Sequence, residues 1–151
     1  MPDVKYILNK QEIEKRIAHR YLFSLLDGVT ELTPKHSICA HKHLYEEDEL
    51  LKGHFPENPV MPGILTVESL AQAAGVLVYE SVDPNEQRFM LYLVAMEVCK
   101  FRAPIYPPAD IFLHVRLETK KKMFWKFYCE AIVDDKVVAE VTMTQAPGKY
   151  I

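Results

Sequence analysis

The sequence has few cysteines and no pattern that pairs them. Cys39, Cys99 and Cys129 are odd in number, widely separated and free of any Cys-x-x-Cys spacing. This argues against a zinc or redox motif built from paired cysteines and predicts reduced thiols. The chain also lacks an excess of positive charge, and a formal net charge of −3 gives no basis for nucleic-acid binding.

Long apolar runs are missing as well. No segment is apolar over the length needed to cross a bilayer. The first residues, MPDVKYILNKQE, lack the basic start and apolar run of a signal peptide. We therefore expect a cytoplasmic protein without a membrane span. No repeat or linker divides the 151 residues, so we expect a single domain over residues 1–151.

What the chain does contain is one unusually apolar helical segment. From Gly63 to Glu80, apolar residues cover most of the circumference of a predicted helix, interrupted by Glu68, Gln72 and Gly75. A helix that is apolar on nearly every side belongs inside a protein. The remaining chain must therefore wrap around this helix.

The rest of the sequence predicts mostly strands. A capping box at Asn9 indicates a short helix to about Ile17. Alternating apolar residues and turn signals predict five or six mostly antiparallel strands, over residues 23–32, 37–45, 89–100, 111–118 and a hairpin over 124–144. Tyr92 and Phe101 are expected in the core of this sheet. One sheet face covering one long helix makes an α+β domain.

His54 is the first candidate for chemistry. It lies in a loop that contains Pro56, Pro59 and Pro62, and these prolines restrict the backbone. A stiff loop holds a side chain in place, and histidine is mostly neutral at pH 7 and can act as a base. The alternative is an ordinary loop histidine without a function.

Glu68 is the second candidate, because carboxylates are rarely buried without a partner. Gln72 lies one turn later on the same side of the predicted helix. Burial should raise the pKa of Glu68, which would suit a proton donor near neutral pH. The alternative is a structural carboxylate that is satisfied by hydrogen bonds.

Gly63 stands at the expected start of the helix, where unpaired N–H groups could bind a substrate carbonyl. A plain turn glycine is the alternative.

His41 and His43 would share one face of a strand, but the sequence specifies no further ligands, so we expect no metal site there.

Together these residues resemble a known family. GHFPENPVMPG, followed by Glu68-Ser-Leu-Ala-Gln72, is similar to the (3R)-3-hydroxyacyl-[acyl carrier protein] dehydratases of type II fatty-acid synthesis, in the branch with a catalytic glutamate. The resemblance extends over nearly the whole chain. It includes an amino-terminal AHRYLFSLLD, a KFRAP strand and a closing hairpin with WKF and VVAE.

The resemblance implies a hot-dog fold, in which an antiparallel sheet wraps around one central helix. It implies His54 as general base, Glu68 as general acid and the Gly63 N–H as the group that polarises the thioester carbonyl. An apolar tunnel would take the acyl chain, with Tyr92, Phe55 and Gln72 as candidate lining residues. No cofactor is implied.

The implied partners are an acyl carrier protein and a second copy of the chain. The family forms dimers, often three to a hexamer, whose active sites combine His54 of one subunit with Glu68 of the other. Because carrier proteins are acidic, a basic patch is needed for docking, and the candidates are Arg16, Arg20, Lys100, Arg102 and Lys120 to Lys122. Three alternatives remain open: a hot-dog thioesterase, an enoyl-CoA hydratase and a non-catalytic acyl-binding paralogue.

Overall fold

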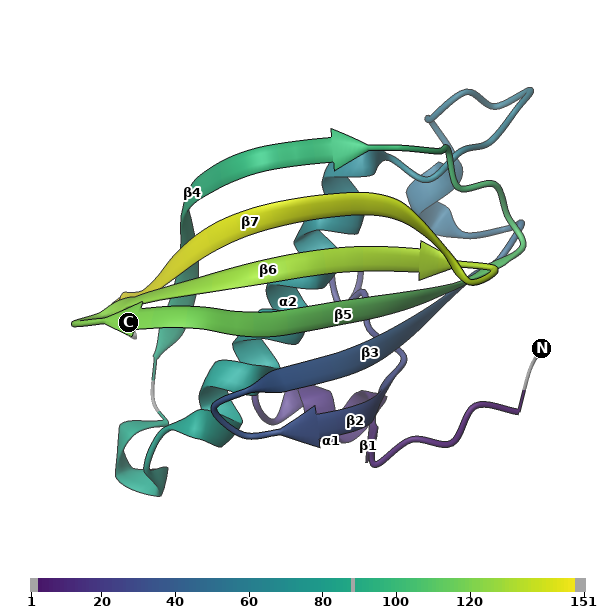
Figure 1. Ribbon diagram of the computed structural model, residues 1–151. Helices are drawn as coiled ribbons and strands as arrows, with labels where there is room; N and C mark the ends of the chain where they lie inside the picture. The colour runs from purple at the N-terminus through teal and green to yellow at the C-terminus, as the bar shows by residue number, and fades with distance from the viewer. Residues whose placement is uncertain (1–2, 88, 149–151) are drawn as a thin grey trace.

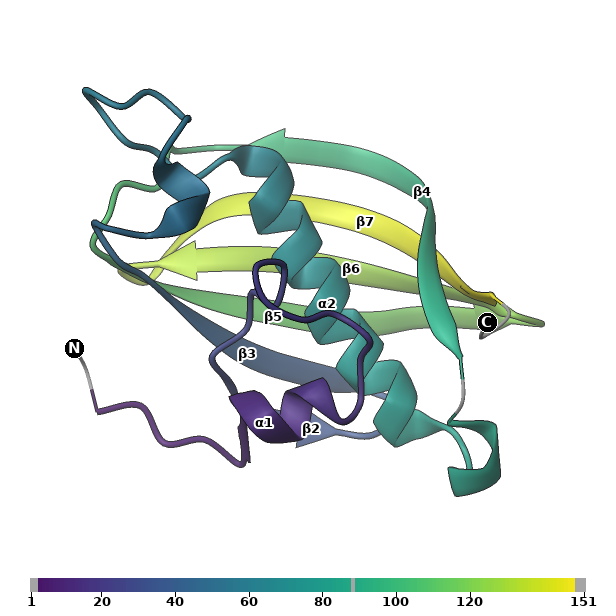
Figure 2. The ribbon, with the colours of Figure 1, turned by 180° about the vertical axis from the view of Figure 1, so that it is seen from behind.

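The computed structural model of the protein describes residues 3–87 and 89–148. In this part of the chain, seven antiparallel strands form one curved sheet in the order β1-β2-β3-β5-β6-β7-β4. The strands are β1 (Leu8–Asn9), β2 (Gly28–Thr33), β3 (Ser37–Leu44), β4 (Met90–Phe101), β5 (Ala109–Lys121), β6 (Phe124–Val133) and β7 (Lys136–Gly148). The long helix α2 (Gly63–Ser81) crosses the concave face of this sheet (Figure 1; Figure 2). The predicted hot-dog fold is therefore confirmed.

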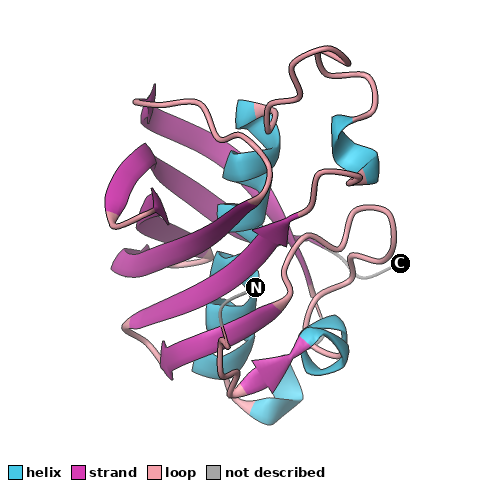
Figure 3. Ribbon diagram, turned by 90° about the vertical axis from the view of Figure 1, so that its right-hand side faces the viewer, coloured by secondary structure: helices cyan, strands magenta, loops and turns pink. Residues whose placement is uncertain are grey.

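Helix α2 is central because its sequence is apolar and its ends are well marked. It begins directly after Pro62 and ends before Pro84, at which the chain turns into the short 3-10 helix η2 (Pro84–Glu86). Most of its side chains are buried against β5, β3 and β6. Seen edge-on, the helix lies along one side of the sheet and the other side faces outward (Figure 3). Among the described residues, no helix has the length and apolarity to span a membrane.

The segment before β2 differs from the sequence prediction. Helix α1 (Lys10–Glu14) has the expected capping box at Asn9 but ends before Ile17. The strand predicted from residue 23 begins only at Gly28. The reason is a tertiary contact: the side chain of Gln72 accepts from Leu25 N at 3.1 Å and donates to Phe23 O at 2.8 Å. These backbone groups therefore bond to α2 instead of to a neighbouring strand.

Strand β4 lies at an edge of the sheet and, in the described part of the chain, pairs only with β7. The prediction that Tyr92 and Phe101 belong to the core is wrong for this chain alone, because they are 49% and 54% exposed. Other large apolar side chains of β4 are exposed as well, namely Leu93, Val94, Met96 and Val98. A long apolar edge strand of this kind offers unpaired backbone groups to another strand.

Candidate active site

His54 lies in the loop between the short 3-10 helix η1 (Glu49–Leu51) and α2. Its Nδ1 is 2.7 Å from the carbonyl oxygen of Val60. Because a carbonyl only accepts hydrogen bonds, Nδ1 carries the proton, and in the neutral ring Nε2 is left with a free lone pair. The ring also contacts Phe55, with 4.4 Å between the ring centroids. This tautomer leaves Nε2 as the ring nitrogen that can accept a proton.

The loop around His54 is held from both ends. Phe55 adopts a positive φ of 59°, and its carbonyl accepts from Asn58 N at 2.8 Å. Further along, Met61 N donates to Ile105 O at 2.9 Å, which ties the loop to the segment after β4. The Phe55 side chain is 60% exposed and leaves this surface beside His54 apolar.

Gly63 opens α2 directly behind this loop. Pro62 occupies the N-cap position and makes no side-chain capping bond, and its carbonyl accepts from Leu65 N at 2.9 Å. Within the described residues, this leaves the N–H groups of Gly63 and Ile64 for another acceptor. A Cβ added at Gly63 would lie 2.8 Å from the Phe101 ring, so the ring would have to shift to admit any other residue. His54, Gly63 and Phe101 line one cavity of about 500 Å³.

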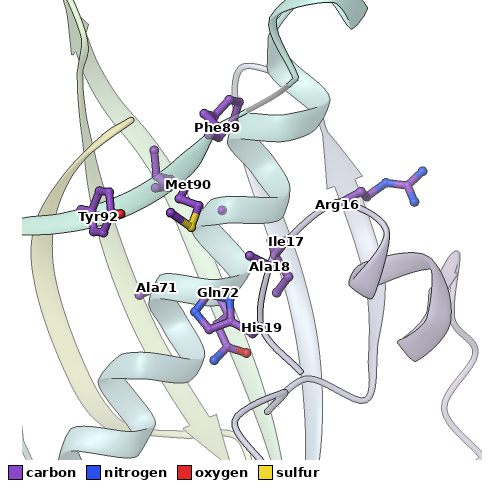
Figure 4. Close-up of a pocket in the computed structure, with 11 residues that line it drawn as sticks. Arg16, Ile17, Ala18, His19, Ala71, Gln72, Phe89, Met90 and Tyr92 are labelled. Atoms are coloured by element: carbon purple, nitrogen blue, oxygen red, sulfur yellow. The ribbon is translucent and has the colours of Figure 1, made fainter. Parts of the chain in front are cut away.

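Glu68 faces a different surface of α2. Its Oε1 lies 3.1 Å from His19 Nε2 and 3.1 Å from Gln72 Nε2. Beside this pair is a second cavity of about 290 Å³, lined by His19, Gln72, Met90 and Tyr92 among others. Figure 4 shows the His19 ring and the Gln72 amide close to each other, with Met90 and Tyr92 approaching from β4.

The electrostatics of Glu68 correct one expectation. Burial does raise the pKa of its carboxyl, as predicted, and burial is the largest single influence. The hydrogen bonds from His19 and Gln72 and the charge of His19 together outweigh it, so the pKa of Glu68 is lowered from its ordinary value. The predicted rise in pKa is therefore wrong, because the sequence did not reveal these donors.

The structure sorts the predicted site residues into two groups. His54, Phe55 and Gly63 lie together, and Gln72 and Tyr92 lie with Glu68. Gln72 is only 1% exposed and braces Glu68 and the segment before β2, although it also lines the second cavity. His19 was not predicted as a site residue. The signal was present in the amino-terminal AHRYLFSLLD motif, but nothing in the sequence linked it to Glu68.

His41 and His43 are engaged with a carboxylate. His41 Nε2 lies 2.8 Å and His43 Nδ1 lies 2.9 Å from Asp110 Oδ1, and Tyr6 Oη lies 2.7 Å from His41 Nδ1. Within residues 3–87 and 89–148, no cluster of three or more His, Cys, Asp or Glu side chains is arranged to bind a metal ion.

Comparison with known proteins shows the family to which the chain is similar. Residues 17–142 match the family model of the FabA-like domain. The chain is 41% identical over 142 residues to "3-hydroxyacyl-[acyl-carrier-protein] dehydratase FabZ" of Oleidesulfovibrio alaskensis, covering 94% of this chain and 92% of that enzyme. It is 43% identical over 141 residues to the enzyme of the same name from Nitratidesulfovibrio vulgaris strain Miyazaki F, covering 93% and 91%.

Solved structures agree on the fold. The dehydratase heterocomplex ApeI:P from Xenorhabdus doucetiae superimposes with a TM-score of 0.76 over 96% of this chain and 93% of that one, at 14% identity. A hypothetical thioesterase from Streptococcus pneumoniae gives a TM-score of 0.61 over 80% and 84%, at 7% identity. At such identities these structures support the hot-dog fold alone. The family match and the curated relatives go further: the chain belongs to the FabA-like family, alongside the FabZ dehydratases.

Proposed function

We propose that the protein removes water from (3R)-3-hydroxyacyl-[acyl carrier protein] to give the trans-2-enoyl thioester in fatty-acid elongation in the cytoplasm. The observation that carries this proposal is the pairing of a histidine whose Nε2 is free with an uncapped helix start in one cavity. A base next to unpaired N–H groups suits proton abstraction beside a carbonyl. The dehydratase relatives, similar over nearly the whole chain, support the same reaction.

In the proposed reaction the Gly63 N–H donates a hydrogen bond to the thioester carbonyl, which makes the C2 proton more acidic. His54 Nε2 removes that proton. The electron pair of the C2–H bond forms the C2=C3 double bond, and the C3–O bond breaks with its electrons. Glu68 protonates the departing oxygen, so that water leaves. The thioester carbonyl takes up the developing charge, so no step calls for a metal or an organic cofactor.

The complete site needs two copies of the chain in this proposal. At about 100° per residue, Glu68 lies about 140° around α2 from Gly63, so the two face different sides of the helix. Tyr92 lies at the Glu68 cavity and Phe101 at the His54 cavity, at opposite ends of β4. If the exposed edges of two β4 strands pair antiparallel about a two-fold axis, the Tyr92 end of one lies beside the Phe101 end of the other. That pairing would join each His54 cavity to the Glu68 cavity of the second copy.

This homodimer would also cover the apolar side chains that β4 leaves exposed. Three dimers could then assemble into a hexamer, as the family resemblance implies. The acyl chain would run between the joined cavities, past Tyr92 and Phe55. A size measurement in solution by light scattering tests the assembly, and a monomeric chain with full activity would contradict the two-copy site.

The acidic carrier protein is proposed to dock at the β5–β6 hairpin. Several other cations are already paired: Arg16 with Glu80, Arg102 with Glu140 and Lys126 with Glu97. Lys120, Lys121 and Lys122 are exposed, and no ion pair involves them among the described residues. Lys120 and Lys122 line a cavity of about 320 Å³ together with Phe89, which also lines the cavity beside Glu68. A carrier bound there could deliver its acyl group to that cavity.

One assay separates the candidate activities. The protein is incubated with 3-hydroxybutyryl and crotonoyl thioesters of both acyl carrier protein and coenzyme A, while enoyl absorbance and free thiol are followed in parallel. Enoyl formation and its reversal, without thiol release and with preference for the carrier-linked substrate, are expected. Thiol release would identify a thioesterase, preference for coenzyme A would identify a hydratase, and no change would leave a binding protein.

A further inference from the structure

The carboxylate of Glu68 is held by one oxygen only. Oε1 receives both His19 Nε2 and Gln72 Nε2, each at 3.1 Å. Among the described residues, no group donates to Oε2. One oxygen therefore fixes the side chain in place, and the other is left to face a substrate. The His19 ring is itself held by stacking on Phe23, with 6.5 Å between the ring centroids and 18° between the planes.

The two nitrogens of His19 have different surroundings. Nε2 faces a carboxylate oxygen, which accepts a hydrogen bond, so before any proton transfer Nε2 carries a proton. Nδ1 is buried and has no hydrogen-bond partner within residues 3–87 and 89–148. The ring lines the cavity of about 290 Å³ beside Glu68. The charge of His19 therefore depends on whether Nδ1 also holds a proton, and Nδ1 is not committed to an acceptor in the protein.

Glu68 needs a source of protons if it is the acid. The hydrogen bonds that hold it lower the pKa of the carboxyl, so near neutral pH it is ionised in the free protein. The departing hydroxyl must nevertheless take up a proton. His19 is the titratable side chain bonded to Glu68. Of the other charged or titratable groups nearby, Arg16 is paired with Glu80, Arg20 donates to the carbonyls of Ile17 and His19, and Tyr92 lines the far side of the cavity.

We infer that His19 and Glu68 act as one acid, in which the imidazolium of His19 supplies the proton that Glu68 passes to the departing hydroxyl. The inference rests on the proposed dehydration. The Nε2 proton moves to the carboxylate and then to the oxygen released from C3, which leaves His19 neutral with its remaining proton on Nδ1. His54 meanwhile holds the C2 proton and returns it through solvent, so that no proton is consumed overall. His19 is thus a positioning and proton-supplying residue that acts through Glu68.

The pH profile of kcat distinguishes this role from simple bracing. In His19→Gln the amide can still donate to Glu68 but cannot supply a proton. We expect kcat to fall about 100-fold at pH 8.5 and less than about 10-fold at pH 6, because acidic solvent increasingly protonates Glu68 directly. His36→Gln, at an exposed turn, is the matched control and should follow the parent at every pH. A loss in His19→Gln that is equal at pH 6 and pH 8.5 would reduce His19 to a brace and overturn the inference.

A second measurement does not depend on turnover. The ring nitrogens of His19 are titrated by NMR in the parent protein and in Glu68→Gln, which keeps the size of the side chain but removes its charge. The two titrations should differ, because the charged carboxylate that faces Nε2 is present only in the parent. Equal midpoints would show that the pair is not coupled and would overturn the inference. A chain that is inactive on every thioester but shows the shifted midpoint would instead contradict the proposed dehydration and leave the pair intact.

Discussion

The proposed base and the proposed acid are held by groups of different chemistry. His54 is oriented by the backbone carbonyl of Val60, which cannot change its charge. Glu68 is held by His19 and Gln72, and His19 can gain or lose a proton. The base is therefore fixed in one tautomer by an invariant acceptor, whereas the acid shares its state with a neighbour. The group that holds Glu68 can therefore change its charge, whereas the group that holds His54 cannot.

The largest expected effect comes from removing either group. His54→Ala and Glu68→Gln should each lower kcat by about 10²–10⁴-fold, since each removes one proton transfer. Steady-state assays on a 3-hydroxyacyl thioester measure this loss, and circular dichroism checks that the fold is kept. If either variant folds and keeps the parental turnover, the substituted residue does not take part in the proton transfers, and base and acid are wrongly assigned.

Mixing the two inactive variants tests whether base and acid come from different copies. After denaturation and refolding together, half of the dimers would contain one chain of each kind. Each mixed dimer would have one site with both defects and one intact site, so activity should approach roughly a quarter of the parent value. If mass spectrometry confirms mixed dimers but activity stays absent, both residues belong to one chain and the two-copy site is wrong.

Gln72→Met tests how much of the Glu68 side depends on one amide. The replacement is similar in size, but it leaves Leu25 N and Phe23 O without their side-chain partner. At about 1–3 kcal/mol for each of the two unsatisfied groups, the free energy of unfolding should fall by about 2–6 kcal/mol. Urea unfolding measures this change. Gln11→Met, on the exposed side of α1, is the control and should stay within about 0.5 kcal/mol. Equal stability of both variants would show that the amide does not brace this segment.

The smallest expected effect concerns docking and not chemistry. Lys121→Glu combined with Lys122→Glu should raise KM for the carrier-linked substrate several-fold at low salt and leave turnover of a short pantetheine thioester unchanged, because exposed charges are screened by salt. Lys136→Glu, at the start of β7 and at the other end of the sheet, is the control. An equal rise in KM for both substrates would show that the substitutions disturb the active site and not the docking of the carrier protein.

The sequence predicted most of the fold because the signals were local. The apolar circumference of α2, the capping box at Asn9 and the hairpin of β6 and β7 each follow from residues close together in the chain. The irregular segment before β2 could not be predicted in this way. Phe23 and Leu25 bond to Gln72, which lies more than 40 residues later, so a run that reads as a strand never joins the sheet there.

The sequence singled out residue types for the candidate site but did not reveal their electrostatics. His54, Gly63 and Glu68 stood out as unusual residues around one helix, and their catalytic roles stay predictions. The lowered pKa of Glu68 depends on His19, 49 residues earlier, and no spacing rule joins the two. The exposure of Tyr92 and Phe101 could not be predicted either. Alternation of apolar and polar residues shows which face of a strand is buried, but it does not show whether the strand lies at the edge of the sheet.

The irregular register of β4 has a consequence for the solubility of the free chain. The pairing of β4 with β7 shifts twice, between Leu93 and Ala95 and between Glu97 and Cys99. Bulges of this kind bend and twist a strand, so a straight foreign strand finds few consecutive groups to bond along this edge. A second copy carries the same two irregularities and can match them by symmetry. The β4 edge would then pair with β4 of a second copy more readily than with an unrelated strand. It would so resist the uncontrolled addition of strands that leads to fibrils.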